Sequence, residues 1–83
     1  MEHDLILARS VTYAQRMQRA VSKAGIRCQM FRAPRDLSNS GCAYAIKVEP
    51  ADLANALYAI YRSSLGPVRV FSYQNGIYRE VSV

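Results

Sequence analysis

Hydrophobic and polar positions alternate with a period of two in several stretches of this chain, and this alternation is typical of strands with one buried face. One stretch, Leu5-Ile6-Leu7-Ala8, is instead almost continuously apolar, which suits a central strand. Together the patterns predict strands over residues 4–9, 26–32, 44–48, 68–73 and 77–81. Asn75-Gly76 is a strong signal for a hairpin between the last two strands.

A helical period marks the segment after the first strand. Its apolar stripe consists of Ala14, Met17, Val21 and Ala24. Ser10 and Thr12 are both candidate N-caps, and Thr12 has a capping-box partner in Gln15. Gly25 supplies the residue at which such a helix ends.

A second helix is predicted to open at Glu49-Pro50-Ala51-Asp52 and to end at Gly66-Pro67. Proline in the first turn needs no N–H, and acidic groups suit the positive end of the helix dipole. The expected buried stripe consists of Leu53, Ala56, Leu57, Ile60 and Ser64.

The order of these elements is βαββαβ plus a terminal strand. With right-handed crossovers this order predicts an α+β fold, a ferredoxin-like antiparallel sheet with two helices on one face and an added C-terminal edge strand. The other face is expected to be open, basic and aromatic, with Arg27, Gln29, Phe31, Ala45, Lys47, Arg69, Phe71 and Tyr73. Such a face predicts a partner surface or the inside of a two-fold homodimer.

Composition narrows the class of protein. The 83 residues are expected to form a single domain, residues 1–83, and the net charge of +5 favours anionic partners. No apolar run approaches the roughly 20 residues of a membrane span, and Met1-Glu2-His3-Asp4 lacks the basic start of a secretory signal. Two cysteines without a CxxC pattern fit a reducing compartment. We therefore expect a soluble cytoplasmic protein that contacts no membrane.

Regular structure is predicted to stop near Pro34 and to resume at Tyr44, which makes residues 34–43 a loop that delivers Cys42 to the head of a strand. The functional interpretation of Cys42 is an exposed carrier thiol, and the structural one is a small residue at a strand entrance. Cys28 alternates with core positions, so we expect it to be structural and not bonded to Cys42.

Four residues near Cys42 in the sequence are candidates to support a sulfur anion. Arg35 and Lys47 would contribute positive charge, and Gly41 would let backbone N–H groups approach. Ser40 could donate a hydrogen bond, although serines in turns more often satisfy their own backbone. For Arg35 the alternative is a solvated loop arginine.

The loop also carries a recognisable sequence. A Pro-Arg pair, a Leu-Ser step and then Gly-Cys-small-Tyr-small-Ile, within residues 34–46, resemble the small family described as putative selenium/sulfur carrier protein-like. The resemblance extends over most of the chain up to Val48, with one departure, since Ala43 stands where the family usually has glycine. It implies a cytoplasmic protein whose Cys42 holds sulfur or selenium, received from a donor such as a cysteine desulfurase.

Two other functions remain open from the residues alone. A ferredoxin-like sheet can stack nucleic-acid bases on strand aromatics, here Phe31, Phe71 and Tyr73, although the strand over residues 44–48 does not match the common RNA-recognition pattern. An assembly or regulatory subunit could use the same face. No paired carboxylates, GxGxxG or metal-ligand spacing indicates a classical enzyme, a cofactor or a metal, and His3 has no assigned role.

Overall fold

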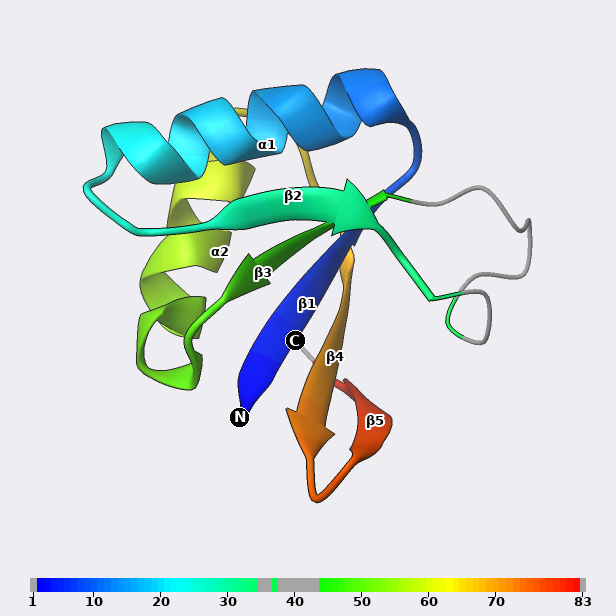
Figure 1. Ribbon diagram of the computed structural model, residues 1–83. Helices are drawn as coiled ribbons and strands as arrows, with labels where there is room; N and C mark the ends of the chain where they lie inside the picture. The colour runs from blue at the N-terminus through cyan, green and yellow to red at the C-terminus, as the bar shows by residue number, and fades with distance from the viewer. Residues whose placement is uncertain (1, 35–36, 38–43, 83) are drawn as a thin grey trace.

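The computed structural model describes residues 2–34, 37 and 44–82 (Figure 1). The elements are β1 (His3–Ala8), α1 (Val11–Lys23), β2 (Gln29–Arg32), β3 (Tyr44–Val48), the 3-10 helix η2 (Pro50–Asp52), α2 (Leu53–Arg62), β4 (Arg69–Gln74) and β5 (Ile77–Val81). Within the described residues, no helix has the length and apolar character needed to cross a bilayer.

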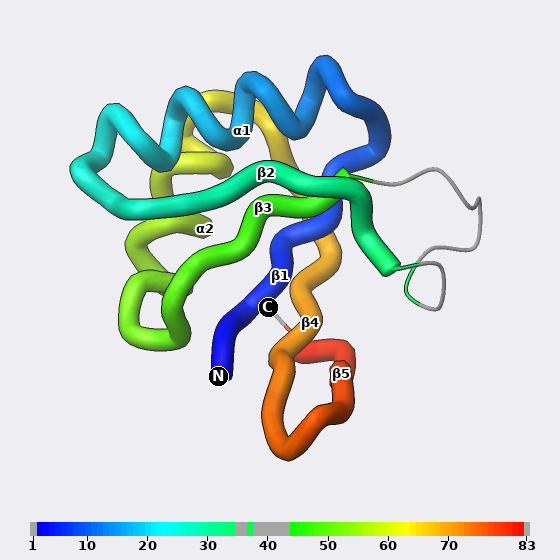
Figure 2. The backbone as a smooth tube through the Cα atoms, viewed as in Figure 1, coloured from blue at the N-terminus to red at the C-terminus, as the bar shows by residue number. Residues whose placement is uncertain are grey.

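The strands form one five-stranded antiparallel sheet in the order β2-β3-β1-β4-β5. Both helices lie on the same side of it, as the backbone tube in Figure 2 shows. This confirms the predicted ferredoxin-like arrangement, and β5 is the added C-terminal strand at one edge. The short β2 forms the other edge, and β1 lies in the centre.

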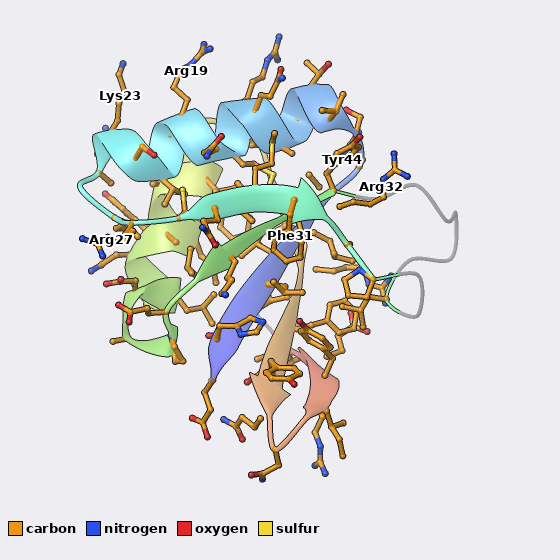
Figure 3. The ribbon with its side chains drawn as sticks, viewed as in Figure 1. Arg19, Lys23, Arg27, Phe31, Arg32 and Tyr44 are labelled. Carbon is orange, nitrogen blue, oxygen red and sulfur yellow. The ribbon has the colours of Figure 1, made fainter. Side chains whose placement is uncertain are left out.

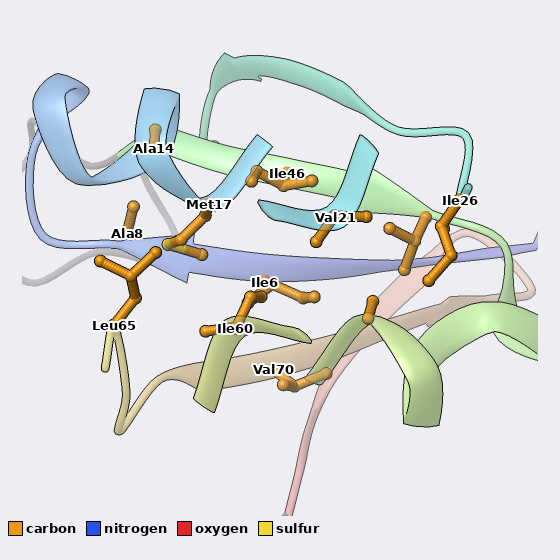
Figure 4. Close-up of a cluster of buried hydrophobic side chains, with 12 residues drawn as sticks. Ile6, Ala8, Ala14, Met17, Val21, Ile26, Ile46, Ile60, Leu65 and Val70 are labelled. Atoms are coloured by element: carbon orange, nitrogen blue, oxygen red, sulfur yellow. The ribbon is translucent and has the colours of Figure 1, made fainter. Parts of the chain in front are cut away.

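The core between the helices and the sheet contains one face of β1 and the apolar stripes of α1 and α2 (Figure 4). Its fully buried large side chains are Ile6, Met17, Val21, Ile46, Ile60 and Val70, each with no exposed surface. Removing one such side chain from water contributes roughly 1.5–3 kcal/mol, so this layer is the main source of stability. The predicted stripe of α1 is confirmed at Ala14, Met17 and Val21.

The face away from the helices is covered as well, contrary to the expectation of an open face. Leu5 and Ala45 have no exposed surface there, and Phe71 is only 6% exposed. Ala33 and Leu37 belong to the same buried cluster, because the chain that leaves β2 turns back onto this face. The N–H of Leu37 donates to the carbonyl of Pro34 (3.1 Å), which closes that turn.

Some predicted boundaries need correction. The strand expected over residues 26–32 is regular only from Gln29, although Ile26 is buried as expected. Ser64 does not belong to the stripe of α2: it is exposed and has a φ of 60°, in the left-handed region, and so lies beyond the end of the helix. Leu65 occupies the buried position instead, 7% exposed.

The beginning of α1 distinguishes the two candidate N-caps. Ser10 has extended backbone angles, and its Oγ accepts a hydrogen bond from the N–H of Tyr13 (3.2 Å). Thr12 lies inside the helix and is exposed. Ser10 is therefore the cap, and the capping box of Thr12 is wrong.

We expect Ser10→Ala to lower the free energy of unfolding by about 1 kcal/mol, because one N–H at the start of α1 loses its acceptor. Thr12→Ala is the matched control and should change stability by less than about 0.5 kcal/mol. Urea unfolding followed by circular dichroism measures both. A larger loss for Thr12→Ala than for Ser10→Ala would contradict this assignment.

Candidate functional site

Of the predicted site residues, the structure describes only Lys47. Cys42, Arg35, Ser40 and Gly41 lie outside the described residues. The structure does define the strand ends on either side of these residues, namely the end of β2 at Arg32 and the beginning of β3 at Tyr44, together with the side chains around them.

These two positions lie at one end of the sheet. Arg32, the last residue of β2, pairs with Tyr44, the first residue of β3, and Tyr44 also pairs with Ala8 at the end of β1. Ser10, the N-cap of α1, follows two residues later in the chain. Figure 3 shows Arg32 and Tyr44 side by side at this end, which we call the loop root, defined by Ala8, Arg9, Arg32 and Tyr44.

The loop root carries two arginines that the sequence analysis did not nominate. The guanidinium of Arg9 lies 4.6 Å from the ring centre of Tyr13, and that of Arg32 lies 5.7 Å from the ring centre of Tyr44. Stacking over a ring keeps a guanidinium in place and leaves its positive charge intact. Each arginine lies at the end of a strand, and both strands, β1 and β2, pair with β3. The strand pairing expected for this fold was therefore the signal that could have placed both arginines at this end of the sheet.

A third arginine near this end has its charge matched by a carboxylate. Arg69 in β4 pairs with Leu7, and it donates two hydrogen bonds to Glu80, each 3.0 Å long. The hydrogen bond from Arg69 lowers the pKa of the Glu80 carboxyl, and its charge acts in the same direction. The charge of Arg69 is therefore largely compensated by Glu80.

Lys47 lies three residues along β3 from Tyr44, roughly 10 Å at the rise of a strand. It is half-buried, pairs with Leu5 and Gln29, and lines a hollow of about 570 Å³ that none of the loop-root residues lines. The structure thus places Lys47 in a different environment from Arg9 and Arg32.

Two further residues that line this hollow, His3 and Tyr78, form a cluster of three rings with Tyr73. The Nε2 atom of His3 and the hydroxyl of Tyr78 are 3.0 Å apart, and His3 stacks on Tyr73 with 4.8 Å between ring centres. Burial, and then the neighbouring Tyr73, raise the pKa of Tyr78. This role of His3 was not predictable from the sequence, because its partner Tyr78 is 75 positions away in the chain.

The other cysteine lies on the helix side. Cys28 is half-buried and packs against the helix-side core, as expected for a structural residue. Its Sγ is 3.7 Å from the hydroxyl of Ser22 and 3.8 Å from the carbonyl of Gln18, to which it donates. Among the described residues, no group of His, Cys, Asp and Glu could hold a metal ion.

Comparison with known proteins finds the same family that the residues of the loop resemble. Residues 4–71 match the family described as putative Se/S carrier protein-like, so the chain belongs to this family. The match includes β1 from Asp4 onward, both helices and the segment between β2 and β3. Neither a curated protein nor a solved structure gives a significant match.

The ring cluster generates a prediction about alkaline pH. Because the pKa of Tyr78 is raised above its usual 10.0 in the folded state, its contribution to stability is complete below that value and is lost as the pH rises through the folded pKa. The phenolate absorbance of the wild type minus that of Tyr78→Phe should therefore have its midpoint above pH 10.

Tyr73→Phe should move the transition of Tyr78 part of the way back, since burial is the larger cause and remains. Tyr58→Phe, at a ring 63% exposed, is the control that should leave it in place. A Tyr78 transition at or below pH 10 in the folded wild type would contradict the cluster.

Proposed function

We propose that this protein carries sulfur or selenium as a persulfide or perselenide on the thiol of Cys42, in the reducing cytoplasm. The observation that supports this most is membership of the Se/S carrier-like family over residues 4–71, a match that includes Cys42. The second cysteine, Cys28, is engaged with Ser22 and the helix-side core and is a poorer candidate.

The proposed transfer needs no oxidant and no metal. The thiolate of Cys42 attacks the outer sulfur of a donor persulfide, such as that of a cysteine desulfurase, and a new S–S bond forms. The donor's own S–S bond breaks, and the donor leaves as a thiolate. A thiolate on the acceptor then attacks the outer sulfur in the same way, which releases Cys42 as a thiolate again.

The electrostatics of the loop root favour this chemistry. A cysteine with the usual pKa near 8.5 is only a few per cent thiolate at neutral pH, and positive charge nearby raises that fraction. Two residues of chain span at most about 7 Å, so the Tyr44 end of β3 sets the surroundings available to Cys42. Arg9 and Arg32 provide positive charge at that end.

The proposal assigns the remaining candidates by chemistry. Arg35 adds a further cation within the same loop, and Gly41 and Ser40 supply N–H and O–H donors to the terminal sulfur. Lys47, roughly 10 Å along β3 from Tyr44, is the least suited of the four to contact the sulfur directly.

The alternative function, base stacking on the sheet, has less support than the sequence suggested. Phe71 is 6% exposed and Tyr73 is stacked on His3, so neither ring is free to receive a base. The homodimer remains a proposal, supported by less apolar surface than the sequence suggested. That surface consists of the half-buried Phe31 and the exposed Ile77 on the edge strand β5.

The test is the intact mass of the protein after incubation with a cysteine desulfurase and cysteine. We expect the wild type and Cys28→Ser to gain the mass of one sulfur atom, and Cys42→Ser to gain none. Treatment with a reductant should remove the added mass, as it does for a persulfide. Loading of Cys42→Ser, or loss of loading in a folded Cys28→Ser, would overturn the assignment.

A further inference from the structure

The outward side of α1 is positively charged without compensation. Val11–Lys23 contains no acidic residue, and Arg16, Arg19 and Lys23 are all exposed. Figure 3 shows Arg19 and Lys23 pointing away from the sheet. Among the described residues, the structure records no ion pair for any of the three.

These three cations also line one hollow. It measures about 260 Å³ and lies between α1 and the segment after α2, with Ser63 and Leu65 on its far side. No carboxylate lines it. Like charges gathered around one hollow repel each other, and a bound anion would relieve that repulsion. We call Arg16, Arg19 and Lys23 the α1 basic surface.

A structural explanation accounts for only part of this charge. Lys23 in the last turn suits the negative end of the α1 dipole, but Arg16 lies in the middle of the helix, where the dipole has little effect. The last carbonyls of both helices already accept backbone hydrogen bonds, for example from Ala24 to Ala20 and from Ser63 to Ala59. The helix ends therefore do not require three cations.

We infer that the α1 basic surface binds the phosphodiester backbone of a nucleic acid. Protein partners are usually held by a central aromatic or large apolar anchor, and the residues that line this hollow offer only Leu65, which is 7% exposed. The next hollow along α1 is lined by Arg19 with Gln15, Gln18 and Ser22. Amide, hydroxyl and guanidinium groups together are typical of contacts to phosphate and sugar.

This inference goes beyond the carrier function and does not depend on it. The α1 basic surface runs from Arg16, roughly 9 Å from the N-cap at 1.5 Å per residue, to Lys23, roughly 20 Å from it, whereas the loop root lies at the N-cap end.

The experiment measures the anisotropy of a labelled single-stranded RNA of about ten nucleotides, and of DNA with the same sequence. The test variant is Arg16→Gln/Arg19→Gln. The matched control is Arg27→Gln/Arg79→Gln, which removes the same charge from exposed positions elsewhere. Thermal unfolding of both variants confirms that they are folded, and Lys23→Gln serves as a second, milder test.

At about 50 mM salt we expect the test variant to bind at least ten-fold more weakly, and the control to stay within about three-fold. The slope of log affinity against log salt should fall by about 1.4 for the two lost contacts, and by about 0.7 for Lys23→Gln. Binding of one nucleic acid only would identify which of the two is the ligand.

Three results would overturn the inference. The first is no binding of either nucleic acid at low salt. The second is an equal loss in the test and control variants, which would indicate net charge alone. The third is tighter binding of polyglutamate than of RNA or DNA with the same dependence on Arg16 and Arg19, which would assign the surface to an acidic protein.

Discussion

The central strand β1 is apolar on both faces, and the rest of the structure follows from the need to cover both. Ile6 and Leu5 are neighbours in the sequence, point to opposite sides of the sheet, and have no exposed surface. The two helices cover the side of Ile6. The side of Leu5 is covered without a helix, by Phe71 from β4 and by the chain that leaves β2. A sheet of this kind has two cores, and the smaller one is built partly from a loop.

This second core connects folding with the proposed chemistry. Leu37 lies between Arg35 and Cys42 in the sequence. Its neighbours in the sequence are polar, but Leu37 itself is buried in the apolar cluster on the sheet. Arg9 and Arg32 are held over tyrosine rings at the loop root. The buried Leu37 thus ties the chain that leaves β2 to the sheet, and Arg9 and Arg32 lie at the neighbouring strand ends, whereas the α1 basic surface forms a separate region of positive charge.

Most of the fold could be predicted from local patterns, because alternation, caps and turn residues act within a few positions. Gly25 and Asn75-Gly76 all have positive φ, as their turns require. The closed second face could not be predicted in this way, since the alternation of Phe71 does not reveal what packs on it. The contacts of His3 with Tyr73 and Tyr78 could not be predicted either, because these partners are distant in the sequence. The one available signal was Leu37, a lone large apolar residue in a polar loop.

The central claim, that the chain leaving β2 closes the second core through Leu37, is tested most directly by the free energy of unfolding of Leu37→Ala. Leu37 is 8% exposed, so we expect a loss of about 2 kcal/mol or more in urea unfolding. Val11→Ala, at a position 40% exposed, is the control and should stay within about 0.5 kcal/mol. A Leu37→Ala variant as stable as this control would contradict the account.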